Sequence, residues 1–156
     1  MALQIGDVAP DFEADTTEGR IKFHEWLGDG WGVLVSHPKD FTPVCTTELG
    51  AMAGIKHEFD KRNAKLIGIS VDSKAALRAW AEEEGYDFTI LADFWPHGAV
   101  AKEYGVFLDG KGFANRATFV IDENGIIRAS FITAPGQARS VEEYRAALDE
   151  VRPVSV

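Results

Sequence analysis

Residues 33–48 read VLVSHPKDFTPVCTTE and place the only cysteine of the chain where a buried strand gives way to a helix. The valine-rich run that opens this stretch is typical of a buried strand, and Pro38 ends it. Thr42 is a good N-cap residue, and Pro43 suits the first helical position because its missing N–H costs nothing there. The pattern therefore predicts a strand, a turn and a helix with Cys45 as the third helical residue.

This position favours a thiolate at Cys45, because the sulfur lies near the positive end of the helix dipole and near unpaired backbone N–H groups. Thr42 can donate its hydroxyl hydrogen to the sulfur while an oxygen lone pair caps the helix. The alternative is that Cys45 is a small buried hydrophobic residue, which is the commoner fate of a free cysteine. Position alone leaves both interpretations open.

Helix and strand patterns alternate on both sides of this stretch. Residues 46–62 carry apolar side chains at helical spacing, and residues 65–71 form a nearly continuous apolar run, typical of a strand covered on both faces. Further strands are expected at 11–14, 21–23 and 89–92, and a glycine-rich turn at 25–32. One helix is expected to begin after its capping residues 72–73, and two more at 99–104 and 141–151. The DENG turn at 122–125 predicts a hairpin of strands 117–121 and 126–131. This order predicts a thioredoxin-like α/β fold, a central mixed β-sheet flanked by helices.

Length and composition indicate one globular domain over residues 1–156. The chain has a mass of 17.1 kDa, with 46% hydrophobic and 26% charged residues, which is the balance of an ordinary globular protein. Its net charge of -9 argues against nucleic acid and anionic membrane surfaces as partners. The N-terminal residues lack a basic segment followed by an apolar one, and no stretch has membrane-spanning length, so we expect a cytoplasmic protein.

The cysteine count limits the redox chemistry. One cysteine excludes an intramolecular disulfide, a C-x-x-C pair and a cysteine-rich zinc site. Any redox cycle must therefore finish on another molecule. His24 and His57 are isolated in the sequence, so we expect neither a metal site nor a cofactor.

The spacing of Pro38, Thr42 and Cys45 reproduces the P-x-x-x-T-x-x-C signature of the peroxiredoxins. Phe41, Pro43 and Glu48 fit the usual surroundings of that signature, and residues 21–50 resemble the animal and plant one-cysteine peroxiredoxins. The second half differs, because residues 93–100, 104–107 and 114–116 more closely resemble the AhpE type of actinobacterial one-cysteine peroxiredoxin. The resemblance covers nearly the whole chain and implies the same thioredoxin-like fold.

The resemblance implies a role for each signature residue. Cys45 would be the peroxidatic nucleophile, Thr42 would hydrogen-bond the peroxide, and Pro38 would shield the sulfur from water. Arg116 would offer a guanidinium to the sulfur and the peroxide oxygens, although most arginines are simply exposed on the surface. Glu48 resembles the glutamate that orients this arginine; its alternative role is to complement the helix N-terminus.

His37 precedes the signature proline, as it does in the animal and plant type. It can tune or gate the thiol. It can equally be a structural histidine at the end of a strand, because proximity alone does not establish proton transfer.

The function that follows is a thiol-dependent peroxidase. Cys45 would reduce hydrogen peroxide, an organic hydroperoxide or peroxynitrite and become a sulfenic acid, which an external thiol reduces. The resemblance suggests mycothiol with mycoredoxin, glutathione or thioredoxin as reductant. One alternative is a peroxide-sensing regulator that binds a partner through oxidised Cys45. Another is an inert domain of the same fold, against which the combination of Pro38, Thr42, Cys45 and Arg116 argues.

Two further expectations concern activity and assembly. The animal type carries a Gly-Asp-Ser-Trp-Gly segment whose serine is assigned to a phospholipase activity, and here Gly30 takes that serine's place. We therefore expect no phospholipase activity, although His24 resembles the histidine of that site. The AhpE-like second half points to a homodimer that packs near the active-site loop, or to a higher oligomer, with Phe41 and Trp95 as candidate contacts.

Overall fold

The computed structural model describes residues 3–39 and 41–152. In these residues a seven-stranded sheet has the order β2-β1-β5-β4-β3-β8-β9, and a separate two-stranded hairpin is formed by β6 and β7. The strands are β1 (Glu13–Thr16), β2 (Gly19–Lys22), β3 (Trp31–Ser36), β4 (Ala64–Ser70), β5 (Thr89–Ala92), β6 (Phe107–Leu108), β7 (Phe113–Ala114), β8 (Arg116–Ile121) and β9 (Ile127–Thr133). The helices are α1 (Phe23–Leu27), α2 (Pro43–Gly54), α3 (Lys56–Asp60), α4 (Lys74–Glu84), α5 (Ala99–Glu103) and α6 (Val141–Val151).

The sheet is mixed. Its centre is parallel, because β3 pairs with β4 and β4 with β5 in the same direction. The flanks are antiparallel: β8 pairs with the other edge of β3, β9 follows β8, and β1 joins β5. This arrangement confirms the predicted thioredoxin-like fold with a mixed central sheet.

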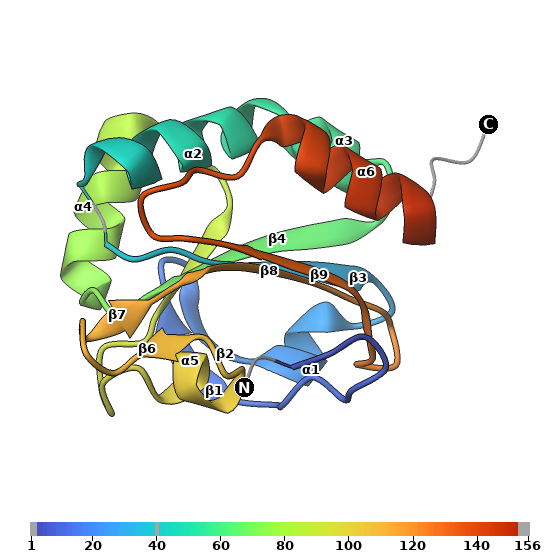
Figure 1. The fold of residues 1–156 in the computed structure, drawn as a ribbon, viewed down its shortest axis with the longest axis horizontal. Helices are drawn as coiled ribbons and strands as arrows, with labels where there is room; N and C mark the ends of the chain where they lie inside the picture. Colours follow the sequence, from blue (N-terminus) through green and yellow to red (C-terminus); the bar gives the residue numbers. More distant parts are fainter. Residues whose placement is uncertain (1–2, 40, 153–156) are drawn as a thin grey trace.

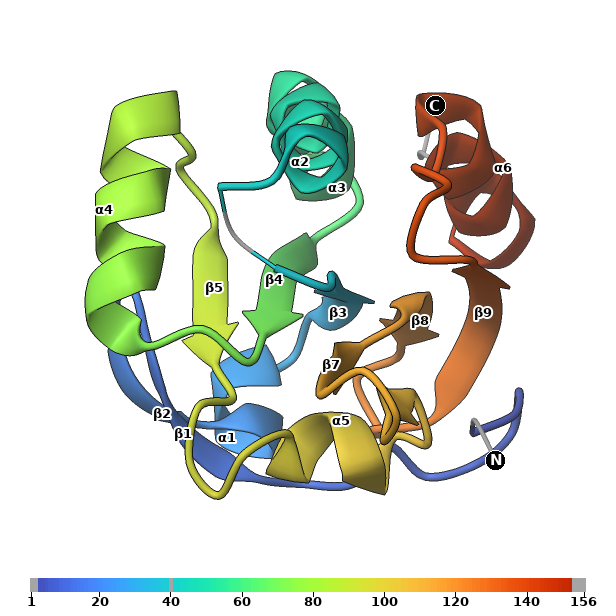
Figure 2. The same ribbon diagram turned by 60° about the vertical axis from the view of Figure 1, so that its left-hand side comes forward.

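Helices cover both faces of the sheet. Figures 1 and 2 show α2, α3, α4 and α6 on one face and α1 and α5 on the other. Because side chains alternate along a strand, Val33 and Val35 of β3 join the core under α2, α4 and α6, whereas Leu34 joins the core on the opposite face. The apolar runs of β3 and β4 follow from burial on both faces.

Several elements match the sequence expectations closely. The strand at 89–92 and the helix at 141–151 have the predicted bounds, and the DENG turn at 122–125 joins β8 to β9. Ser73 caps α4, because its hydroxyl oxygen accepts the backbone N–H of Ala76. These elements were predictable because each has a local sequence signal: the spacing of apolar residues, a capping residue or a set of turn residues.

Other expectations were wrong. The single helix expected at 46–62 is two helices, because α2 ends at Gly54 and Ile55 leaves helical geometry with φ -112° and ψ 16° before α3 begins. Glycine is a poor helix former, and the buried side chain of Ile55 packs into the core at this break. The strand expected to include Phe23 ends at Lys22, and α1 begins where a strand end and a turn were expected.

Candidate active site

Cys45 lies in the first turn of α2, at the carboxyl end of the central strand β3. The helix begins at Pro43 with Thr42 in the N-cap position, as the sequence predicts. Cys45 is a free cysteine and is 0% exposed. The structure therefore buries Cys45 at the start of α2, within the apolar core between this helix and the sheet.

The Thr42 side chain differs from the expectation. Its hydroxyl donates to the carbonyl oxygen of Lys39 at 2.7 Å and makes no capping hydrogen bond to the helix. A hydroxyl has a single hydrogen to donate, so in this arrangement Thr42 does not donate to the sulfur. Because the threonine oxygen does not accept the backbone N–H of Cys45, Thr42 leaves that group for other acceptors.

Glu48 lies about one turn after Cys45 and is buried, with its side chain 0% exposed. One carboxylate oxygen accepts Nη1 of Arg116 at 2.9 Å and Nη2 of Arg139 at 2.7 Å. The other oxygen accepts the backbone N–H of Arg139 at 2.6 Å and its Nε at 2.9 Å. A single carboxylate thus holds two guanidinium groups beside the cysteine turn.

Arg116 is the first residue of β8, and its side chain is 2% exposed, so the surface alternative does not describe it. Its Nε donates to the carbonyl oxygen of Pro135 at 2.9 Å, while Nη1 donates to Glu48. Contacts from two sides fix the plane of the guanidinium. The structure therefore brings together Glu48 and Arg116, which the sequence singled out as a pair.

Arg139 is a member of this cluster that sequence reasoning missed. Besides Glu48, its Nη1 donates to the carbonyl oxygen of Ala117 at 2.6 Å, and its Nη2 donates to that of Ser36 at 2.7 Å. The guanidinium thereby ties α2 to the ends of β3 and β8. One sequence signal was available: Arg139 directly precedes Ser140, the N-cap of α6, where the helix dipole disfavours a cation.

The charges in this cluster stabilise one another. Burial alone would raise the pKa of Glu48, but the hydrogen bonds and charge of Arg139, helped by the charge of Arg116, outweigh burial and hold that pKa below its usual value. Burial works against the charged form of Arg139, yet its contacts with Glu48 raise its pKa, and the nearby Cys45 adds to this rise. Glu48 and Arg139 therefore carry opposite charges at neutral pH.

His37 and Pro38 are both buried where β3 meets the active-site turn. The His37 ring lies against the indole of Trp80, with centroids 5.3 Å apart and planes tilted by 44°. The shielding role of Pro38 stays a prediction. For His37 the packing fits the structural interpretation and leaves the gating interpretation open.

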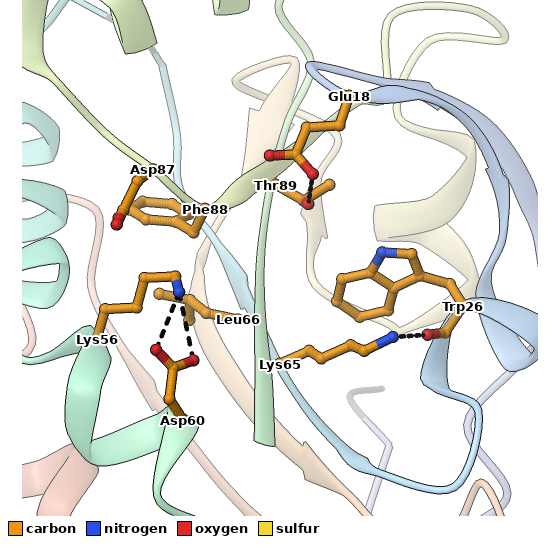
Figure 3. A pocket seen from close by; sticks show the side chains of 9 residues that line it. All are labelled: Glu18, Trp26, Lys56, Asp60, Lys65, Leu66, Asp87, Phe88 and Thr89. Atoms are coloured by element: carbon orange, nitrogen blue, oxygen red, sulfur yellow. Dashed lines mark hydrogen bonds and ion pairs between the residues drawn. The ribbon is translucent and has the colours of Figure 1, made fainter. Parts of the chain in front are cut away.

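A surface pocket of about 290 Å³ lies at the opposite end of the parallel strands, beside the first residues of β4 and β5 (Figure 3). Its charged groups largely engage neighbours already: Lys56 pairs with Asp60, Glu18 accepts the Thr89 hydroxyl, and Lys65 donates to the Trp26 carbonyl oxygen. None of the site residues expected from the sequence lines it. The pocket is lined by Glu18, Trp26, Lys56, Asp60, Lys65, Leu66, Asp87, Phe88 and Thr89.

Neither a metal cluster nor a membrane-spanning helix occurs in the described part of the chain. Within residues 3–39 and 41–152, no three histidine, cysteine, aspartate or glutamate side chains gather in a way that could hold a metal ion. None of the helices in the same ranges combines the length and apolar character needed to cross a membrane.

Known proteins resemble this chain over most of its length. Residues 5–130 match the AhpC/TSA family. Peroxiredoxin PRX1, mitochondrial, of Saccharomyces cerevisiae is 40% identical over 166 residues, which cover 96% of this chain and 62% of the yeast protein. Peroxiredoxin-6 of Gallus gallus is 38% identical, over 96% of this chain and 73% of the chicken protein. The chain thus spans less than two thirds of the length of the yeast relative.

A solved peroxiredoxin structure is also similar to this chain over most of its length. The yeast mitochondrial 1-Cys peroxiredoxin superposes with a TM-score of 0.84 at 42% identity, covering 94% of this chain and 75% of that one. The AhpE-like character of the second half stays a prediction, because these relatives carry other names. The identity, coverage and shared fold together show that this chain belongs to the AhpC/TSA family and is a relative of the one-cysteine peroxiredoxins.

Proposed function

We propose that this protein is a thiol-dependent peroxidase that uses Cys45 in a one-cysteine mechanism. The observation that carries the proposal is the arrangement at the start of α2. The only cysteine of the chain lies in the first helical turn, about one turn before a buried glutamate that holds two arginines. Family membership supports the same reaction.

In this mechanism the Cys45 thiolate attacks the nearer oxygen of the peroxide. The S–O bond forms as the O–O bond breaks, so sulfur loses two electrons and becomes a sulfenic acid. The second oxygen leaves as hydroxide or alkoxide and takes up a proton. Negative charge spreads over both oxygens during this step, and fixed cations and N–H donors stabilise it.

Each neighbouring residue has a part in this proposal. Arg116 supplies the guanidinium for the departing charge, and Glu48 orients it through their 2.9 Å ion pair. Thr42 hydrogen-bonds the peroxide once its hydroxyl turns from the Lys39 carbonyl oxygen, and Pro38 excludes water. Arg139 holds Glu48 in place from the other side.

The sulfenic acid must be reduced by another molecule, because the sequence offers no second cysteine. The yeast mitochondrial 1-Cys peroxiredoxin resolves its thiol via glutathione and thioredoxin systems, which supports these as reductants here. Mycothiol with mycoredoxin is the alternative from the AhpE-like half. Turnover assays with each reductant distinguish them.

A cytoplasmic homodimer remains part of the proposal. Trp95 is 83% exposed and Phe41 is 52% exposed, which supports an apolar contact near the active-site loop. The yeast relative is named as mitochondrial, so a mitochondrial location is the alternative to test. Light scattering of the purified protein measures the assembly, and fractionation of the host cell measures the location.

One equivalent of hydrogen peroxide should convert the reduced protein to a sulfenic acid at Cys45, because this is the only thiol. Mass spectrometry should detect a gain of one oxygen per chain, and dimedone, which forms a thioether with a sulfenic acid and releases its oxygen as water, should label the peptide that contains Cys45. Continued peroxide consumption should require an added thiol and should disappear in Cys45→Ser. Peroxide consumption by the serine variant would refute the proposal. A stable oxidised form that captures another protein without turnover would favour the regulator.

The protein should not release fatty acids from phospholipids, because Gly30 has no side chain to attack an ester. A Cβ added at residue 30 would lie 2.9 Å from the backbone carbonyl oxygen of Asn63, so even Gly30→Ser should not create the activity without a backbone shift. Nε2 of His24 is already 2.7 Å from the Ala9 carbonyl oxygen. The assay is release of a labelled acyl chain from phospholipid vesicles, and release that persists in Cys45→Ser would contradict this prediction.

A further inference from the structure

Trp80 reaches from α4 to the residue that follows Cys45. Helices α4 and α2 lie on the same face of the sheet (Figure 2). The Trp80 side chain is fully buried, and its Nε1–H donates to Oγ1 of Thr46 at 3.2 Å. The same indole packs against His37, and against Phe41 with ring centroids 6.3 Å apart. One side chain of α4 therefore touches the active-site turn both before and after the cysteine.

Tyr86 holds the same residue from a second direction. Gly85 ends α4 with a positive φ of 73°, a conformation that glycine adopts without a steric penalty, and the chain reverses there. The reversal brings the Tyr86 ring edge-on against Trp80, with centroids 5.1 Å apart. The Tyr86 hydroxyl donates to the backbone carbonyl oxygen of Thr46 at 2.9 Å. Both oxygen atoms of Thr46 thus accept hydrogen bonds from this pair.

We propose that Trp80 and Tyr86 act as a clamp on Thr46 that positions Cys45 for reaction with peroxide. With the clamp closed, the first turn of α2 keeps the sulfur covered and near the arginines that Glu48 holds. With the clamp open, the turn moves away, so the sulfur becomes accessible but loses its electrostatic partners. Trp80, Tyr86 and Thr46 are positioning residues of the peroxidase reaction, so this inference rests on the proposed function.

The two states differ in how they react with two reagents. Peroxide is small and needs the arranged charges of the closed turn. Iodoacetamide is larger and must reach the sulfur directly, so it needs the open turn, because Cys45 is 0% exposed when the turn is closed. A looser clamp should therefore slow oxidation and speed alkylation. General unfolding would also expose the sulfur and disperse these charges, so a control variant that lowers stability without touching Thr46 is needed to separate the two explanations.

The most specific variants each remove one hydrogen bond to Thr46 and change the side-chain volume very little. Tyr86→Phe deletes the hydroxyl donor, and Thr46→Val replaces the acceptor with a methyl group on a side chain of the same branched shape. In each variant we expect the second-order rate with hydrogen peroxide to fall about two- to tenfold, as loss of one neutral hydrogen bond allows. Alkylation by iodoacetamide should rise by a similar factor. Thr46→Ser keeps the acceptor and should restore both rates.

A matched control tests the role of Trp80 itself. Trp80→Phe and Trp31→Phe make the same change in the same core cluster. Trp31 begins β3, and among the described residues its indole N–H meets no acceptor. Trp80→Phe should shift the two rates in opposite directions. Trp31→Phe should leave their ratio unchanged, even if it lowers stability as much.

Oxidation and alkylation rates that fall together, or a ratio that stays at the wild-type value in Tyr86→Phe and Thr46→Val, would overturn the clamp. Amide hydrogen exchange in the first turn of α2 gives a readout that does not depend on peroxide, and it should become faster in both variants. If the wild-type protein does not react with peroxide, the proposed function fails. The exchange and alkylation measurements still decide whether the clamp exists.

Discussion

Replacing Arg116 with methionine should slow the reaction of Cys45 with hydrogen peroxide about 10²- to 10³-fold, the usual effect of removing one fixed donor from a developing anion. Arg116 is buried, and its guanidinium is fixed by Glu48 and by the Pro135 carbonyl oxygen. The other arginine at Glu48, Arg139, is held by backbone carbonyl oxygens of β3 and β8 and cannot take its place without rearrangement. Stopped-flow fluorescence of the reduced protein against a series of peroxide concentrations measures the rate.

The fold should survive this substitution. Glu48 keeps three hydrogen bonds to Arg139, at 2.6 Å, 2.9 Å and 2.7 Å, so its charge remains paired. Arg116→Lys should have an intermediate rate, because lysine keeps the charge but cannot present two parallel N–H donors. Arg128→Met is a control, since Arg128 lies on β9 with its side chain 47% exposed.

A rate within threefold of wild type in a folded Arg116→Met protein would show that the guanidinium does not stabilise the reaction. The Arg128→Met control should react like the wild type. If Arg128→Met slows the reaction as much as Arg116→Met, overall charge rather than local geometry controls the rate.

The elements that the sequence predicted well are those with local signals. Pro38 and Pro43 delimit the turn between β3 and α2, and the DENG residues at 122–125 form the turn between β8 and β9. The helix α1 has no such signal, because it depends on tertiary packing: Phe23 and Leu27, one turn apart, are buried against the sheet. Helices this short gain their stability from packing rather than from propensity.

The same contrast applies to the candidate site. Cys45 and Glu48 lie on one helix turn, so their proximity follows from the 3.6-residue period. Arg139 contacts Glu48 across 91 residues of sequence and Ser36 across 103, and no local pattern encodes such contacts. The partner of the Thr42 hydroxyl was not predictable either, because a hydroxyl rotates freely among nearby acceptors.

Replacing Glu48 with glutamine should lower the free energy of unfolding by about 3–5 kcal/mol, the usual effect of removing one partner from a buried ion pair. Glutamine has nearly the same shape, so no cavity accounts for the loss. The variant leaves Arg116 and Arg139 buried side by side without a counter-charge, at 2% and 3% exposure. Urea denaturation at pH 7, monitored by tryptophan fluorescence, measures the difference.

The difference in the free energy of unfolding between the wild type and Glu48→Gln should become smaller at low pH. The folded protein holds the pKa of Glu48 below its usual value, because the hydrogen bonds and charge of Arg139 outweigh the effect of burial. A carboxyl group whose pKa is lowered by folding stabilises the protein above its unfolded pKa, about 4.3 for glutamate. This stabilisation is lost as the pH falls from that value through the lower folded pKa. The stabilities of the wild type and Glu48→Gln should therefore begin to approach one another as the pH falls below the unfolded pKa.

Glu58→Gln provides the comparison within the same chain. Glu58 pairs with Arg145 at 2.7 Å, but the arginine side chain is 43% exposed, so water and salt screen the pair. Its loss should cost no more than about 1 kcal/mol. If Glu48→Gln costs as little as Glu58→Gln, or if its deficit persists unchanged below pH 4, the two arginines do not depend on the carboxylate. The electrostatic account of how Glu48 holds Arg116 in place would then be wrong.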